Sequence, residues 1–202
     1  IVNRVMLFEL LRDQGSFGAL GLDTRTGQLS EFRAKAVILG TGTVTLADNA
    51  VLGTNLRAPW LISCEFARRL IKLKQPGRIV NISSSSGQTG AVGMCTYSSS
   101  KGAVITLTRS MAQELGPLGI TVNNICPGYV WTSLVENQIP DTMKARGLTR
   151  DQVINDVLLA NQPQKKFVQV EQLAALAVFL CREEASAITG ANLSVDGGWT
   201  AQ

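Results

Sequence analysis

The sequence of 202 residues contains no histidine. This absence excludes a Ser-His-Asp or Cys-His nucleophile and any metal site that depends on a histidine ligand. No CxxC pair is present that would indicate a zinc or redox site. Isolated cysteines in apolar surroundings favour buried thiols in a reducing compartment, so we expect a cytoplasmic protein without a bound metal. The four cysteines are Cys64, Cys95, Cys126 and Cys181.

Long hydrophobic runs are also absent. Every apolar run is too short to span a bilayer, which excludes a transmembrane segment and predicts no membrane partner. The first residues carry Arg4 and Glu9, which argues against a signal peptide. With 45% hydrophobic and 17% charged residues, the composition is that of a globular domain with a sizeable core.

The formal net charge of +4 is small, and the basic residues gather in one place. Their cluster falls at the end of a helical pattern, where cations complement the helix dipole. We therefore expect a solvated helix end rather than a nucleic-acid site. The cluster consists of Arg68, Arg69, Lys72, Lys74 and Arg78.

Hydrophobic periodicity predicts strands and helices in alternation. Short apolar runs, typical of strands buried on both faces of a parallel sheet, occupy residues 36–39, 78–82, 120–125 and 191–195. Helical spacing covers residues 46–74, 97–115 and 170–181, the last apolar nearly all round and therefore expected to be well buried. Residues 83–93 read as a Ser/Gly loop and residues 133–166 as mixed helical pieces. This order predicts an α/β fold with a parallel sheet and flanking helices.

Residues 1–34 follow another pattern. Apolar stretches at 2–11, 17–22 and 28–32 are separated by turn sequences, of which Asp23–Gly27 has the residues of a hairpin turn. They predict an N-terminal antiparallel β-meander attached to the α/β unit. Because the strand at 36–39 then lies near a sheet edge, we also expect the chain to self-associate.

The chemistry-bearing residues are Ser84, Tyr97 and Lys101. Tyr97 and Lys101 are one helical turn apart and share a face of the predicted helix. A nearby ammonium favours the phenolate and lowers the pKa of a tyrosine. Ser84 follows a predicted strand and can hold a substrate oxygen while Tyr97 moves a proton. Taken alone, such a Tyr–Lys pair is more often an ordinary surface pair.

Four sequence motifs add to these residues. They are GRIVNISSSSG, TYSSSKGAV, ITVNNICPGYVWT and ITGANLSVDGGW, in that order along the chain. Residues from about 45 to 202 resemble the short-chain dehydrogenase/reductase family through these motifs. The resemblance implies a partial Rossmann-like sheet, an NAD(P)-dependent oxidoreductase, and a homodimer or homotetramer that binds a small-molecule substrate and no nucleic acid.

The resemblance also implies roles for individual residues. Ser84 orients the substrate, Tyr97 is the catalytic acid/base, and Lys101 lowers the pKa of Tyr97 and binds the nicotinamide ribose. Asn55, in TNLRAPW, completes the catalytic set and its water relay. The loop that cradles the nicotinamide of NAD or NADP corresponds to Pro127, Gly128, Val130 and Thr132.

From Ser133 onward the chain resembles one branch of that family, the D-3-hydroxybutyrate dehydrogenases. Gln138 matches a glutamine that holds the substrate carboxylate there. Ser86 and Met94 stand where that branch has a histidine and a lysine, and Met94 supplies no charge-assisted partner for a carboxylate. The implied substrate is a small hydroxy acid, alcohol or carbonyl, with 3-hydroxybutyrate among the candidates.

One motif of the family is missing. No TGxxxGxG turn, whose backbone amides approach the pyrophosphate, occurs in the sequence, so we expect weak cofactor binding. Residues 2–43 instead resemble a segment of fumarate reductase/succinate dehydrogenase-type flavoproteins, but no FAD-binding GxGxxG accompanies them and FAD binding is not expected. We therefore predict two units, 1–43 and 44–202, joined as in a chimera. The alternative to an oxidoreductase is a non-catalytic scaffold that lacks a complete dinucleotide site.

Overall fold

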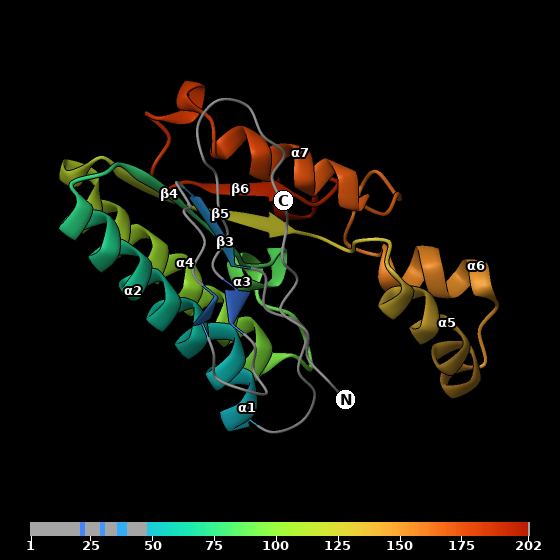
Figure 1. The fold of residues 1–202 in the computed structure, drawn as a ribbon. Coiled ribbons are helices and arrows are strands. Elements are labelled where there is room, and N and C mark those ends of the chain that lie inside the picture. Colours follow the sequence, from blue (N-terminus) through green and yellow to red (C-terminus); the bar gives the residue numbers. More distant parts are fainter. Residues whose placement is uncertain (1–20, 23–28, 31–35, 40–47, 202) are drawn as a thin grey trace.

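The structure is a computed structural model that describes residues 21–22, 29–30, 36–39 and 48–201 (Figure 1). Four described strands form a parallel sheet in the order β3-β4-β5-β6. Their bounds are β3 (Ala36–Leu39), β4 (Gly77–Ile82), β5 (Ile120–Pro127) and β6 (Asn192–Val195). The predicted parallel sheet is therefore confirmed, and within the described part β3 lies at one edge of it.

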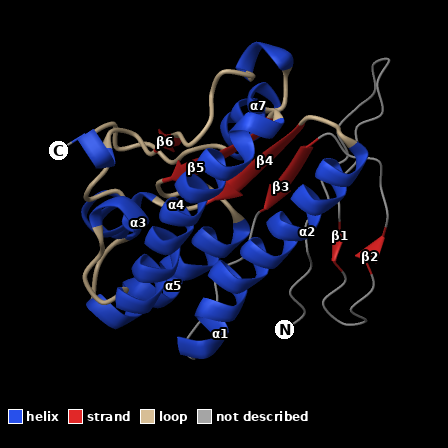
Figure 2. Cartoon of the chain, turned by 90° about the vertical axis from the view of Figure 1, so that its left-hand side faces the viewer, coloured by secondary structure: helices blue, strands red, loops and turns tan. Residues whose placement is uncertain are grey.

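Helices cover both faces of the sheet (Figures 1 and 2). On one face, α2 (Ala58–Leu73) and α4 (Cys95–Leu115) pack on Ile79 and Val122. On the other face, α7 (Val170–Leu180) packs on Val80 and Ile125. Neighbouring strand residues thus serve opposite faces, and because both faces are covered, these strands read as continuous apolar runs. Full burial of each such side chain contributes about 1.5–3 kcal/mol to folding.

The predicted helix at 46–74 contains a change of helical type. Helix α1 (Asp48–Leu52) passes through a π-helical turn, η1 (Gly53–Arg57), into α2. The N–H of Ala58 bonds back to the carbonyl of Gly53 across this turn. Pro59 lies in the first turn of α2, where proline is tolerated. The wide turn places Asn55 on the buried side of the helix.

The segment 83–93 was expected to be a loop, and this prediction is wrong for part of it. A short helix, α3 (Ser85–Thr89), follows β4 directly, and Ser84 is its N-cap. A serine hydroxyl at this position satisfies a backbone N–H that the first turn leaves unpaired. Five residues are too few to give a helical hydrophobic pattern, so this element was not predicted.

Two expectations about burial also need correction. Only Ala177 and Leu180 of α7 are buried, and Val170 and Phe179 are 43% and 40% exposed, because one side of this helix faces solvent. In the basic cluster, Arg78 is not solvated. It lies on β4 with its side chain buried, donates to the Gly77 carbonyl and pairs with Glu183 at 3.1 Å.

Of the cysteines expected to be buried, only Cys126 is; Cys95 is exposed, and Cys64 and Cys181 are half-buried. The other predicted elements agree with the described residues. Residues 133–166 contain the expected helical pieces, α5 (Ser133–Arg146), α6 (Arg150–Gln152) and the π-helix η3 (Val153–Leu158). Strands β1 (Gly21–Leu22) and β2 (Leu29–Ser30) pair antiparallel, as part of a meander would. The predicted strand at 2–11 and the turn at 23–27 lie outside the described residues. No helix in the described part of the chain is long and apolar enough to cross a membrane.

Candidate active site

The candidate site lies at the carboxyl ends of the central strands. Ser84 follows β4, and Pro127 is the last residue of β5. Open parallel sheets bind ligands at this edge, because the loops that follow neighbouring strands meet there. The topology alone therefore brings together two motifs that are more than forty residues apart in the sequence.

Ser84 is held in one orientation by its role as a helix cap. Its backbone is extended, and its Oγ accepts from the Ser86 N–H at 3.2 Å. The hydroxyl oxygens of Ser84 and Ser86 are 3.0 Å apart and share a hydrogen bond. Ser86, predicted to be near the substrate, is therefore buried directly beside the candidate catalytic serine.

Tyr97 lies on the first turn of α4, close enough to the Ser84 side chain for that hydroxyl to influence its pKa. Burial raises the pKa of Tyr97 above its ordinary value, and the Ser84 hydroxyl opposes that rise. The sequence led us to expect a lowered pKa, so this expectation is corrected. Removal of the phenolate from water outweighs the favourable contacts that Tyr97 makes.

Lys101 follows Tyr97 by one turn of α4 and is almost completely buried. Its Nζ lies 5.9 Å from the centre of the Tyr97 ring and donates to the Ile82 carbonyl at 2.9 Å. Burial lowers the pKa of Lys101 to about 8. The Lys101 side chain therefore lies beside Tyr97 as predicted. Burial disfavours the charged form of both groups, so Lys101 loses its proton more readily than an exposed lysine.

A hydrogen bond from the segment between β4 and α3 fixes the position of that segment against α4. The Ser83 hydroxyl donates to the carbonyl of Lys101 at 2.8 Å. This bond ties the end of β4 to the turn of α4 that carries Lys101. Sequence reasoning did not single out Ser83, since nothing distinguishes it from the three serines that follow it.

Asn55 reaches the same turn of α4 from η1. Its Nδ2 donates to the Ser100 hydroxyl at 3.1 Å, and that hydroxyl donates to the Tyr97 carbonyl at 2.7 Å. The Asn55 Oδ1 is buried and has no hydrogen-bond partner among the described residues. Asn55 is therefore linked to the Tyr97 backbone through the Ser100 hydroxyl, and its Oδ1 can accept one further hydrogen bond.

The segment after β5 is the predicted nicotinamide loop. Trp131 N–H donates to the Val168 carbonyl at 2.8 Å, and Val168 N–H donates to the Tyr129 carbonyl at 2.9 Å. In this parallel bridge the N–H and C=O of Val130 point away from Val168. Thr132 then caps α5 by accepting from Val135 N–H at 3.4 Å.

Two predicted substrate residues are exposed to solvent. Met94 is the exposed residue before α4, and Gln138 is an exposed residue of α5. Figure 1 shows α5 and α6 standing away from the sheet. Among the described contacts, none brings Met94 or Gln138 to Ser84.

Sequence reasoning missed an aromatic pair. The rings of Tyr129 and Trp199 are stacked, with centres 6.0 Å apart. The Tyr129 phenol is close enough to Tyr97 to raise its pKa slightly further. Gln88 of α3 also bonds to Ser194 at 2.9 Å, which holds the C-terminal turn next to the helix that Ser84 caps. The sequence did contain a signal for this pair, because Tyr129 and Trp199 each directly follow a glycine turn.

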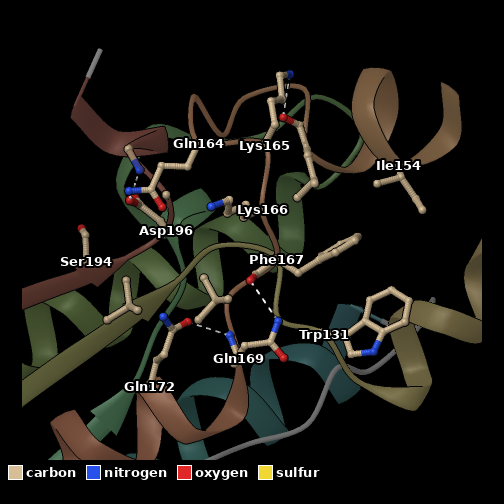
Figure 3. Close-up of a pocket in the computed structure, with 15 residues that line it drawn as sticks. Trp131, Ile154, Gln164, Lys165, Lys166, Phe167, Gln169, Gln172, Ser194 and Asp196 are labelled. Carbon is tan, nitrogen blue, oxygen red and sulfur yellow. Dashed lines mark hydrogen bonds between the residues drawn. The ribbon is translucent and has the colours of Figure 1, made fainter. Parts of the chain in front are cut away.

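A cavity of about 1000 Å³ lies on the Val168 side of the same loop (Figure 3). The end of β6, residues 164–169 and Trp131 line it. Ser84, Tyr97 and Lys101 are not among the residues that line this cavity, so it is separate from the candidate site. The described residues hold no cluster of Cys, Asp and Glu that could bind a metal ion.

Comparison with known proteins agrees with this architecture. The model of the family described as "Enoyl-(Acyl carrier protein) reductase" matches residues 43–200. The chain is 50% identical over 132 residues to a D-beta-hydroxybutyrate dehydrogenase of Rhizobium meliloti (strain 1021), which covers 65% of this chain and 51% of that protein. The chain thus spans about half the length of this curated relative.

Two solved structures show the same fold. A sorbitol-6-phosphate 2-dehydrogenase from Erwinia amylovora has a TM-score of 0.76 and 26% identity, and covers 83% of this chain and 69% of its own. An actinorhodin polyketide ketoreductase with NADPH has a TM-score of 0.74 and 28% identity, and covers 88% of this chain and 70% of its own.

The resemblance of residues 2–43 to flavoproteins is not supported by these comparisons, and nearly all of that segment lies outside the described residues. The family match begins at residue 43, and the motifs that carry Ser84, Tyr97, Lys101 and Gly128 all lie inside it. The chain belongs to the short-chain dehydrogenase/reductase family, in the group whose model is described as enoyl-(acyl carrier protein) reductase.

Proposed function

We propose that this chain carries the catalytic site of an NAD(P)-dependent oxidoreductase that acts on a small hydroxy acid, alcohol or carbonyl. The observation that carries the proposal is the convergence of Ser84, Tyr97 and Lys101. The Ser84 hydroxyl lies close enough to Tyr97 to lower its pKa, and the Lys101 ammonium lies 5.9 Å from the Tyr97 ring. Family membership and the names of the matched relatives support the same reaction class.

The nicotinamide end of the cofactor has a matching surface on the chain. Val130 presents an N–H and a C=O side by side, facing away from Val168. A carboxamide has one acceptor and donors in the same arrangement, so it can pair with both groups. Lys101 offers an ammonium to a ribose hydroxyl, and Pro127, Gly128 and Thr132 hold the two ends of the loop.

A bound nicotinamide cofactor would supply or accept the hydride. The side chains of this chain handle the proton. Because burial raises the pKa of Tyr97, its phenol is protonated at neutral pH and can donate to a substrate carbonyl oxygen. The Ser84 hydroxyl donates a hydrogen bond to the same oxygen, and the nearby Lys101 stabilises the phenolate that remains. Asn55 has an unused acceptor through which a relay can return the proton.

The substrate class follows from what surrounds Tyr97. The stacked Tyr129 and Trp199 form an apolar wall that suits a short aliphatic chain. The Rhizobium meliloti relative supports 3-hydroxybutyrate as one candidate substrate, with Gln138 as the proposed carboxylate holder. Ser86 would contact the substrate oxygen beside Ser84, and Met94 would supply only apolar contact.

The remaining features of the proposal concern the whole protein. We expect it to be cytoplasmic and to form homodimers or homotetramers, with β3 as one edge available for pairing. Light scattering that shows a monomer at micromolar concentration would contradict the self-association. We also propose that residues 1–43 and 44–202 are units of separate origin. The start of the family match at residue 43 supports this division.

Binding of NADH, followed by its fluorescence, tests the function directly. Micromolar affinity, together with NADH-dependent reduction of acetoacetate, would support the oxidoreductase. Absence of binding at millimolar NADH and NADPH would favour the non-catalytic scaffold instead. Parallel assays with a short aldehyde and a short ketone distinguish a 3-hydroxy-acid enzyme from a general carbonyl reductase.

A further inference from the structure

Gln162 is a fully buried amide in the chain segment that follows η3. Its Oε1 accepts from the Tyr129 N–H at 2.6 Å, and its Nε2 donates to the Lys166 carbonyl at 2.8 Å. The first bond reaches across more than thirty residues to the loop after β5, and the second closes the turn that contains Gln162 itself. Both ends of the amide are therefore in use.

Two glycines fit closely around this amide. A Cβ at Gly128 would lie 2.6 Å from the Gln162 Oε1 and 2.9 Å from the Cα of Asp196. A Cβ at Gly197, which has a φ of +61°, would lie 3.1 Å from the Gln162 Nε2. The loops after β5 and β6 thus both lie against Gln162. The close approach at Gly128 and the positive φ at Gly197 each favour glycine.

The loop that Gln162 holds is the one proposed to bind the nicotinamide. Gln162 bonds to the N–H of Tyr129, and Val168 bonds to the residues on either side of Val130. Because hydrogen bonds hold the backbone at both Tyr129 and Trp131, the orientation of the Val130 N–H and C=O is fixed. A shift of the Tyr129 amide would move both groups together.

We propose that Gln162 is a positioning residue for the cofactor, which sets the height of the Gly128–Val130 backbone at the nicotinamide end of the site. The inference rests on the proposed function. It requires an amide, because a side chain at this place must accept from Tyr129 N–H and donate to the Lys166 carbonyl at once. Leucine does neither, and an ionised glutamate can only accept.

The first test compares Gln162→Leu with Gln164→Leu and the wild type. Gln164 is an exposed neighbour whose side chain makes no hydrogen bond in the described part of the chain, so it is a matched control. The Gln162→Leu change should lower kcat/KM for NADH about 10²-fold per folded molecule. Misplacing a reacting group by about 1 Å has an effect of that size. Gln164→Leu should match the wild type, with folded fractions taken from thermal unfolding.

The second test uses Gln162→Glu, whose protonated carboxyl group has the same donor and acceptor pattern as the amide. Burial raises the pKa of a carboxyl group, so this variant should be impaired at pH 8 and recover NADH affinity as the pH falls toward 6. The wild type has no titrating group at this position and should lack this recovery. A purely structural role would lower thermal stability without a pH-dependent NADH affinity per folded molecule.

Amide hydrogen exchange separates this inference from the proposed function. The Tyr129 amide should exchange at least tenfold faster in Gln162→Leu, while the amide of Val122 in β5 is unchanged. If the wild type does not bind NADH, the proposed function fails and with it the cofactor role of Gln162, even where Tyr129 exchange shows that the loop is held. Unchanged NADH affinity per folded molecule, or unchanged exchange at Tyr129, in Gln162→Leu would overturn the inference.

Discussion

Gly87 and Lys101 are in contact where α3 crosses α4. A Cβ at Gly87 would lie 2.8 Å from the carbonyl carbon of Lys101, closer than such atoms approach in folded proteins. The Cβ of a residue at Gly102 would likewise lie 3.2 Å from the Gly87 carbonyl oxygen. These two glycines let α3 approach α4 closely enough for Ser84, the N-cap of α3, to influence the pKa of Tyr97 on α4.

Gly87→Ala should therefore separate the candidate catalytic residues. Its Cβ meets backbone, so α3 must move, and we expect a loss of about 1–3 kcal/mol in stability with a larger loss of activity. Gly116→Ala is the control, because a Cβ there meets nothing within 4 Å. Chemical unfolding and steady-state rates measure both variants. Full activity in Gly87→Ala would show that the close approach is not required.

Tyr97→Phe should abolish oxidoreductase activity and leave the fold intact. The change removes one hydroxyl, and loss of general acid/base catalysis is worth about 10²- to 10⁴-fold in rate. Circular dichroism should match the wild type, and the free energy of unfolding should agree within about 1.5 kcal/mol, because a single side-chain hydrogen bond contributes no more than that. Activity equal to the wild type would place the acid/base elsewhere.

Stability should rise with pH between 8 and 9 because of Lys101. Its pKa is lowered from 10.5 to about 8 in the folded chain, so above pH 8 the unfolded state holds a proton that the folded state releases. Stability increases where the unfolded state binds more protons, here by about 1 kcal/mol up to pH 9. The raised pKa values of Cys126 and Cys181, both about 11, act in the opposite direction, because the unfolded thiols ionise from about pH 8 upward. They reduce the net rise between pH 8 and 9 to a few tenths of a kcal/mol, and above pH 9 they outweigh Lys101.

Lys101→Met isolates that contribution. The variant keeps a long side chain in the buried position without the ammonium. Its unfolding free energy should therefore lack the rise between pH 8 and 9 that the wild type shows. Equal pH profiles for the two proteins would mean that Lys101 titrates normally in the folded state.

A row of asparagines crosses the sheet in register, with Asn81, Asn124 and Asn192 on β4, β5 and β6. Thr108 of α4 accepts from Asn81 at 2.7 Å and donates to Asn124 at 3.1 Å. Thr108→Val should reduce stability by about 1–3 kcal/mol, because it leaves buried amide groups without partners. The exposed Thr106 of the same helix provides the control, and Thr106→Val should change little.

Much of the sheet could be predicted from the sequence because strands buried on both faces are apolar at every position. Ile79 and Val80 are neighbours that face different helices, and both are fully buried. The helical face shared by Tyr97 and Lys101 also follows from spacing alone. The raised pKa of Tyr97 does not, because it depends on how many atoms from distant segments surround the phenol.

Gln162 shows the limit of such prediction more clearly. It lies in a polar stretch of mixed composition, and nothing in its neighbours marks it as buried. Its role depends on Tyr129 and on Gly128, which only the fold brings to it. Ser84 was found because a motif carried it, whereas the cap that orients it required the short helix α3.

Cofactor affinity should be limited in this chain by the pyrophosphate and adenosine part of the site. In the proposed function, Ser84, Tyr97 and Lys101 serve the chemical step, and the loop of Val130 holds the nicotinamide. The sequence has no TGxxxGxG turn to bind the pyrophosphate. Loss of several backbone N–H bonds and a helix terminus removes roughly 4 kcal/mol, or about a thousandfold in affinity.

A comparison of NADH with reduced nicotinamide mononucleotide, which lacks the adenosine half, measures this directly. In nicotinamide enzymes, binding energy from the remote half of the cofactor positions the reacting half. Because the proposed contacts of the described residues lie at the nicotinamide end, the two compounds should bind and react within about tenfold of each other. Gln162→Leu should weaken both to the same extent, because it acts on the nicotinamide loop alone. A thousandfold preference for NADH would instead require backbone amides elsewhere in the chain that hold the pyrophosphate without the glycine-rich sequence.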